Sequence, residues 1–256
     1  MNSYYNRVLK NRKTLVFIGL IFLIPIFDTW KLLRDLQFRP TLVPEYATFL
    51  AGRSMGHFPQ IILIWFLPVF LLILCCDNYT KDYKTGYRHA VILRKSRSYY
   101  YKTTLFGNMI LSFIVMFLSL LLNLFLVYLI FKNGKDFQGL DSGHIYGNKL
   151  LSFSMGNPIA TNIIYIVIFS VICSLCAGLN TVISWIFPDI KFLYPISFMI
   201  WFVHILGDLS LSIVSVIQPF TEVKLADFWP IIIRFFITFI LIILFGYFYR
   251  MRTDEI

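Results

Sequence analysis

Six long apolar segments, separated by polar connections, constrain the fold of this chain more than any other feature. They cover residues 14–30, 58–76, 105–131, 159–187, 190–207 and 229–249. A helix needs about 20 mostly apolar residues to cross the hydrocarbon core of a bilayer. The chain is 58% hydrophobic and 14% charged, whereas soluble domains are about 45–50% apolar and about 25% charged. We therefore predict an all-α polytopic membrane protein with six transmembrane helices in one transmembrane domain, residues 1–256.

The distribution of Lys and Arg among the connections predicts the orientation in the membrane. Six helices place both termini on one side, together with the 77–104 connection and the 187–191 turn. This side carries 14 of the 23 Lys and Arg residues, and the opposite side carries eight. Because cytoplasmic connections are enriched in these residues, we expect both termini and residues 77–104 to be cytoplasmic. The net charge of +10 then indicates contact with anionic membrane lipids rather than with nucleic acid.

The sequence lacks the motifs of common nucleotide-binding and hydrolytic enzymes. It contains no G-x-x-x-x-G-K-[ST], no H-E-x-x-H and no G-x-S-x-G. Cys173 and Cys176 have the spacing of half a metal site, but no second pair accompanies them, so we expect helix packing. We therefore expect no catalytic residues, no metal site and no cofactor on this chain.

Ionisable groups inside a membrane are costly and usually mark function. The candidates in or beside the apolar segments are Asp28, His204, Asp208 and Arg234. The two aspartates lie near segment ends and Arg234 has a long side chain, so we expect these three to reach the headgroup region. We expect His204 to be a hydrogen-bonded packing residue. A proton-coupled carrier is not favoured by this set.

A basic stretch, residues 86–102, stands between the second and third apolar segments. Gly86 can end the preceding helix, and residues 87–97 can then form a short helix. Tyr87, Ala90 and Val91 would form its apolar stripe, because they lie at i, i+3 and i+4. Four cations surround that stripe: Arg88, Arg94, Lys95 and Arg97. The stretch is either a solvated loop against anionic lipid or an amphipathic helix presented to a soluble partner.

This stretch resembles the cytoplasmic segment between the second and third helices of permease subunits of ABC-type exporters of the second class. In that family, an acidic residue precedes a glycine, a helix of about ten residues follows, and Ser-Arg, an aromatic residue and Lys open the third helix. Here Asp82 precedes Gly86, and Ser96-Arg97, Tyr99–Tyr101 and Lys102 follow. Tyr87 stands where the family usually has Thr. The six-segment layout is similar as well.

The resemblance implies that residues 87–97 are a coupling helix seated on a separate ATP-binding-cassette ATPase subunit, which would bind ATP and Mg²⁺. It implies a second permease copy or paralogue, an amphipathic lead-in over residues 2–13, a polar outer segment over residues 208–228, and a place in a bacterial cell membrane. The expected coupling residues are Gly86, Tyr87, Arg88, Val91, Arg94, Lys95 and Arg97.

The apolar segments themselves predict helix packing and the kind of substrate. Ser170, Ser174 and Gly178 form a small-xxx-small ridge, suited either to packing within the chain or to a dimer seam. Polar residues are sparse in the segments, which favours a lipid-like or amphipathic substrate, such as an antimicrobial peptide, moved outward. The alternatives are a secondary carrier or channel, which would need embedded ionisable groups or an inverted repeat, and a membrane enzyme, scaffold or sensor.

Overall fold

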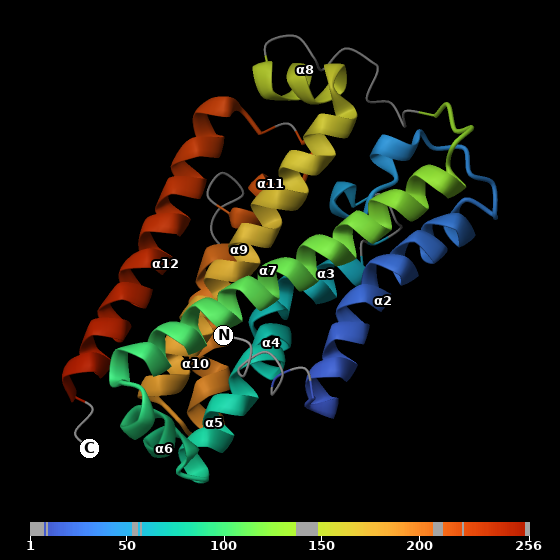
Figure 1. Ribbon diagram of the computed structural model, residues 1–256. Helices are drawn as coiled ribbons and strands as arrows, with labels where there is room; N and C mark the ends of the chain where they lie inside the picture. Colours follow the sequence, from blue (N-terminus) through green and yellow to red (C-terminus); the bar gives the residue numbers. More distant parts are fainter. Residues whose placement is uncertain are drawn as a thin grey trace.

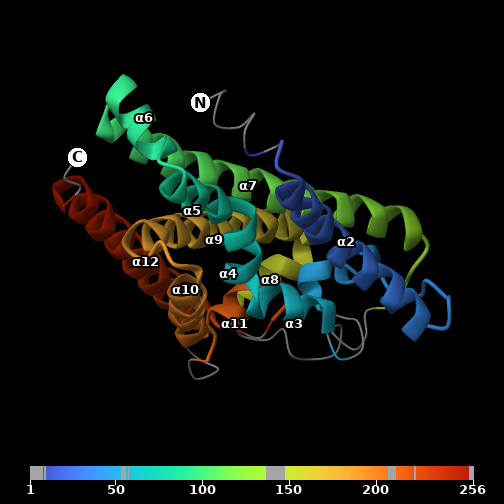
Figure 2. The same cartoon turned by 90° about the horizontal axis from the view of Figure 1, so that it is seen from below.

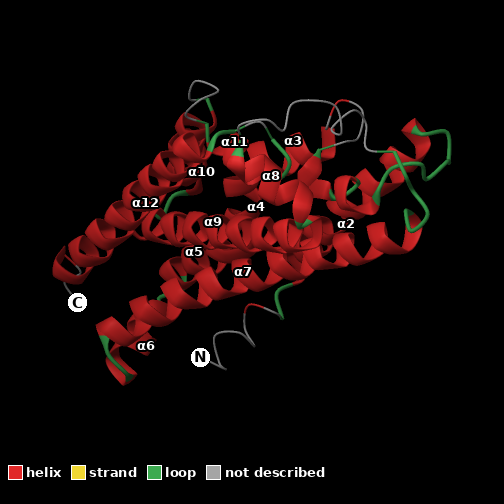
Figure 3. Cartoon of the chain, turned by 90° about the horizontal axis from the view of Figure 1, so that it is seen from above, coloured by secondary structure: helices red, strands yellow, loops and turns green. Residues whose placement is uncertain are grey.

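The computed structural model describes residues 8, 10–52, 56, 58–136, 148–206, 212–221 and 223–253. Most of the predicted lead-in over residues 2–13, and Asp208, lie outside these residues. The described part is helical apart from turns, loops and one isolated bridge between Leu42 and Asp136 (Figure 3). Its helices are α2 (Arg12–Asp35), η1 (Pro44–Tyr46), η2 (Phe49–Ala51), α3 (Phe58–Trp65), α4 (Leu67–Leu71), the π-helical turn η4 (Leu72–Cys76), α5 (Asp77–Lys84), α6 (Tyr87–Arg94), α7 (Arg97–Ile130), α8 (Lys149–Gly156), α9 (Pro158–Ile186), α10 (Ile190–Ile205), α11 (Ile213–Ile217) and α12 (Leu225–Thr253).

Four described helices, α2, α7, α9 and α12, are long and apolar enough to cross a membrane. A fifth crossing is possible if α3 and the helix after it are counted together, although they are bent by 62°. The helix in the fifth expected segment, α10, has only 16 residues and is about 24 Å long, short of a hydrocarbon core of about 30 Å. The prediction of an all-helical protein with several helices suited to crossing a membrane is confirmed; among the described residues, four or five of the six expected crossings are long and apolar enough.

The second apolar segment is not the continuous helix that its hydropathy predicts. It breaks at Phe66, between α3 and α4, because Pro68 has no backbone N–H and its ring crowds the carbonyl of Ile64. The indole Nε1 of Trp201, on α10, donates a hydrogen bond of 2.9 Å to that carbonyl. A distant side chain therefore replaces the donor that the proline removes, as an apolar environment requires.

The first long helix, α2, contains the same arrangement. Pro25 deprives the carbonyl of Ile21 of its donor, and the Ser119 hydroxyl of α7 donates to it over 2.8 Å. One turn further along both helices, Asn123 Nδ2 donates to the Pro25 carbonyl at 3.0 Å and to Thr29 Oγ1 at 2.9 Å. Both contacts advance in the same direction along α2 and α7, so these two helices are parallel and in a fixed register.

The centre of the bundle is α9, which packs against α7, α12, α10 and α4 (Figures 1 and 2). The predicted span 159–187 forms one unbroken helix, Pro158–Ile186. Its polar side chains are used inside the bundle. Thr181 accepts from Asn108 Nδ2 of α7 at 2.8 Å, and Asn180 Nδ2 donates to the carbonyl of Pro68 at 3.0 Å. Such hydrogen bonds remove the cost of burying amides in an apolar core.

The bundle has two ends, which we name after the short helices found there. At the α6 end lie the starts of α2 and α7, helix α6 and the end of α12 (Figure 1). At the α8 end, Leu42 pairs with Asp136, and Asn148 Nδ2 donates to the carbonyl of Val223 at 3.1 Å. The helices alternate in direction between the two ends, so the regions expected on one side of a membrane lie together.

Candidate functional site at the α6 end

Helix α6 is a separate short helix because the chain leaves the helical conformation both before and after it. Gly86 adopts the left-handed conformation, with φ 70° and ψ 2°, which separates α5 from α6 and suits glycine. A Cβ at this position would meet no atom within 4 Å, so the glycine is required by the backbone angle and not by a neighbour. The predicted break at Gly86 is thus confirmed.

The end of α6 differs from the prediction. The helix ends at Arg94, with Lys95 as its C-cap, and does not continue to residue 97. Ser96 is extended, and its hydroxyl accepts a hydrogen bond of 3.1 Å from the backbone N–H of Tyr99. Serine favours this N-cap role, so Arg97 is the first residue of α7 and not part of α6. Helix α7 accordingly starts at Arg97, eight residues before the third predicted span, 105–131.

The buried face of α6 is also different from the predicted apolar stripe. Tyr87 and Ala90 are exposed and Val91 is half-buried, whereas Arg88 and Ile92 are only 4% and 6% exposed. The guanidinium of Arg88 lies 3.5 Å from the hydroxyl of Tyr79 and 5.4 Å from the ring centroid of Tyr83.

Asp82 takes part in the same anchoring. The Tyr100 hydroxyl of α7 donates a hydrogen bond of 3.2 Å to Asp82 Oδ2, and the aspartate is 7% exposed. Tyr79 and Tyr100 are themselves 2% and 4% exposed. Polar side chains from α5, α6 and α7 therefore hold α6 in place. Sequence reasoning noticed Asp82 only as the acid before a glycine and missed both tyrosines, whose spacing gives no signal of this contact.

The outward face of α6 is cationic with one projecting apolar side chain. His89, Arg94 and Lys95 are exposed, and Leu93 is 75% exposed. The Lys95 ammonium lies 5.8 Å from the ring centroid of Tyr99. The described residues contain no group of three His, Cys, Asp or Glu side chains that could hold a metal ion. With exposed cations around a projecting leucine, this face is suited to binding another surface.

The residues after α6 connect it to the last helix. Arg97 Nη1 donates to the backbone carbonyl of Met251 at 3.4 Å, and the hydroxyls of Ser98 and Tyr247 are 3.3 Å apart. A displacement of α6 would therefore be transmitted to α7 directly and to α12 through these contacts.

The small-residue ridge on α9 lies elsewhere. Ser170 is fully buried and Ser174 is half-buried. A Cβ at Gly178 would meet Ile243 of α12 at 3.0 Å and Met109 of α7 at 3.1 Å. We therefore assign Ser170 and Gly178 to packing within the chain, where α9 crosses its two neighbours.

The embedded ionisable groups give a mixed outcome. His204 lies 2.9 Å, through Nδ1, from the carbonyl of Ile200, and its ring meets Phe235 and Phe239 edge-on, as expected of a packing residue. Arg234 is exposed on α12. The side chain of Asp28 is only 3% exposed, so it packs inside the bundle; that it lies at the depth of the headgroups stays a prediction.

These features define an all-helical protein with several helices suited to crossing a membrane and a basic short helix at one end. The chain is 39% identical, over its full length and the full length of the relative, to the uncharacterized protein YybM of Bacillus subtilis (strain 168). It belongs to the same family as YybM. No family model and no solved structure matches the chain.

Proposed function

We propose that this chain is the membrane permease subunit of an ATP-driven exporter of the ABC type, and that α6 is its coupling helix. The observation that carries the proposal is the division of α6 into two faces. Arg88 and Ile92 are buried against the bundle, while Leu93, Arg94 and Lys95 are exposed. A helix held firmly on one side and open on the other can pass a partner's movement to α7 and α12.

The proposed topology has six crossings, with both termini and α6 in the cytoplasm. It counts the bent α3–α4 segment and the short α10 as crossings, which a tilted or locally thinned bilayer permits. The excess of Lys and Arg at the α6 end supports this orientation. The protein then acts in a bacterial cell membrane with a second permease copy or paralogue, and ATP and Mg²⁺ bind to a separate ATPase subunit.

The proposed substrate is lipid-like or amphipathic, such as a membrane-active peptide, and moves outward. The interior supports this choice because the side-chain N–H groups of three buried asparagines are used in hydrogen bonds within the bundle. Asn108, Asn123 and Asn180 all donate to groups within the bundle. Few polar side chains are then left to replace the hydration shell of a sugar or an ion.

The experiment is co-expression of the tagged chain with a candidate ATP-binding-cassette ATPase from the same organism, followed by purification in detergent. Leu93→Asp and Arg94→Glu alter the exposed face of α6 without touching its buried side. We expect both variants to lose most of the bound ATPase and the stimulation of ATP hydrolysis by the permease.

Lys191→Glu is the matched control, because Lys191 is an exposed cation at the start of α10, at the same end of the bundle. This variant should retain the ATPase. If neither α6 variant changes ATPase recovery, or if the control loses the ATPase equally, α6 is not a coupling helix and the exporter proposal fails.

A further inference from the structure

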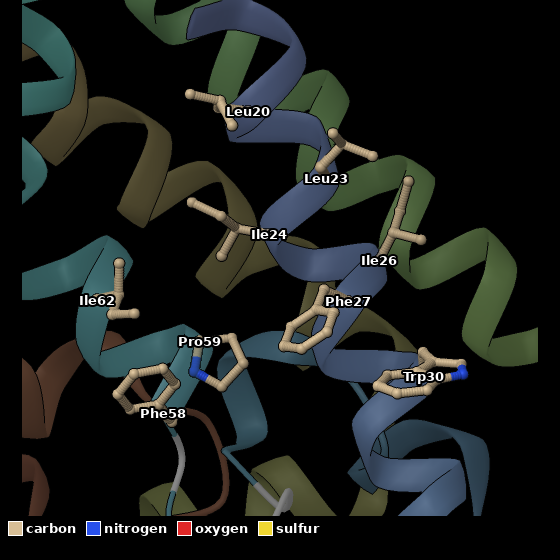
Figure 4. Close-up of a pocket in the computed structure, with 9 residues that line it drawn as sticks. All are labelled: Leu20, Leu23, Ile24, Ile26, Phe27, Trp30, Phe58, Pro59 and Ile62. Atoms are coloured by element: carbon tan, nitrogen blue, oxygen red, sulfur yellow. The ribbon is translucent and has the colours of Figure 1, made fainter.

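An apolar groove runs between α2 and α3 on the outside of the bundle (Figure 4). Its volume is about 540 Å³, within the range of about 300–1,000 Å³ that is common for small-molecule sites. Ile24 and Phe27 of α2 face Pro59 and Ile62 of α3 across it. Phe27 remains 50% exposed, so the described part of the chain does not fill the groove.

The length of the groove matches one leaflet of a bilayer. It extends along α2 from Leu20 to Trp30, which is about 15 Å of helix. The hydrocarbon core of a bilayer is about 30 Å thick, so each leaflet contributes about 15 Å. Trp30 lies at the end of the groove nearest the α8 end and is 46% exposed, as is typical of tryptophan at the headgroup level.

Cations follow directly beyond this end of the groove. The guanidinium of Arg34 lies 5.8 Å from the ring centroid of Trp30, and Lys31 is half-buried beside it in the sequence. Arg39 is exposed after the helix, so residues 31–39 carry three cations and one acid, Asp35. The apolar groove and the positive charge at its mouth are complementary to a lipid with an anionic headgroup.

We propose that the groove holds one acyl chain of an anionic phospholipid, with the lipid phosphate held by Arg34 and Lys31. The phospholipid lies in the leaflet at the α8 end. This assignment is independent of the exporter function and of which side of the membrane that end faces. An apolar side chain in the groove competes with the acyl chain, and loss of the cation weakens only the headgroup contact.

The test is the binding of phosphatidylglycerol to the full chain in detergent, measured by native mass spectrometry. Phosphatidylcholine with the same acyl chains is the comparison lipid. Ile24→Trp fills the groove, and Arg34→Gln removes the headgroup contact. The matched controls are Ile237→Trp, at a residue 54% exposed on α12, and Lys224→Gln, at an exposed cation just before α12. Circular dichroism checks that each variant is folded.

We expect the unaltered chain to bind phosphatidylglycerol more tightly than phosphatidylcholine. Arg34→Gln should lower the affinity for phosphatidylglycerol about five-fold, which is equivalent to about 1 kcal/mol for one cation. The affinity for phosphatidylcholine should not change. Ile24→Trp should lower the affinity for both lipids. The affinities of the control variants should stay within about two-fold of those of the unaltered chain.

Three outcomes would overturn the proposal. The first is equal affinity of the unaltered chain for the two lipids. The second is an equal loss of lipid affinity in Ile237→Trp and Ile24→Trp, which would mean that the lipids bind anywhere on the apolar surface. The third is a dimer that Ile24→Trp dissociates without any change in lipid binding, which would mean that a second copy of the chain occupies the groove.

Discussion

Trp201→Phe is expected to lower the free energy of unfolding by about 2 kcal/mol, more than the loss of ring size alone would give. The indole Nε1 donates to the Ile64 carbonyl at 2.9 Å, and both residues are buried. That carbonyl cannot receive the usual helical hydrogen bond because residue 68 is proline. Phenylalanine keeps a ring beside Phe235 but leaves the carbonyl without this donor.

The magnitude has two parts. Leaving a buried acceptor unsatisfied costs about 1–3 kcal/mol in proteins generally, and hydrogen bonds between membrane helices contribute about 0.6–1.7 kcal/mol, so we assign about 1 kcal/mol to the lost bond. The smaller ring leaves space at a fully buried site, and we assign about 1 kcal/mol more to that. The first part should disappear if another donor reaches the carbonyl.

The assay is unfolding of the purified protein in mixed micelles by increasing sodium dodecyl sulfate, followed by far-ultraviolet circular dichroism. Trp229→Phe is the control, because Trp229 is 55% exposed on α12 and should change stability by less than about 0.5 kcal/mol. Pro68→Ala supplies an N–H at residue 68. In that background, Trp201→Phe should cost only about 1 kcal/mol.

Either of two results would contradict this role for the indole N–H. One is a cost for Trp201→Phe no larger than that of Trp229→Phe. The other is a cost that is unchanged in the Pro68→Ala background, because the indole would then contribute through packing alone.

Three further predictions concern the backbone and its close contacts. Gly246→Ala should lower the free energy of unfolding by about 2 kcal/mol, because the added Cβ would overlap Val182 of α9. The control is Gly19→Ala, whose added Cβ would meet no atom within 4 Å. It should be neutral or slightly stabilising in the same detergent titration. Gly86→Ala should cost about 1–2 kcal/mol and Gly86→Asn less, since asparagine tolerates the left-handed conformation; protease cleavage around α6 measures the difference, and equal cleavage would contradict the role assigned to this angle. Ser119→Ala should cost about 1 kcal/mol by removing the donor to the carbonyl that the proline in α2 leaves open, and an unchanged unfolding midpoint would contradict it.

The all-helical fold class and the places of the apolar helices along the chain can be predicted from the sequence alone. Hydropathy located six apolar segments, and all six are helical in the structure. Gly86 predicted the start of α6, because a left-handed residue is a local property of the chain. Ser96 could have predicted the end of α6 as well, because serine before a long helix is an N-cap signal. The prediction instead grouped Arg97 with the other cations of α6.

The burial of individual residues and the bends of the helices depend on contacts between distant parts of the chain. Arg88 is on the inner face of α6 because Tyr79 and Tyr83 of α5 receive it, and a cation's partners cannot be read from a helical period. The bend at Pro68 persists because Trp201, 137 residues away from Ile64, satisfies the open carbonyl. The groove between α2 and α3 is likewise absent from the hydropathy profile, since apolar side chains score alike whether they meet a neighbouring helix or lipid.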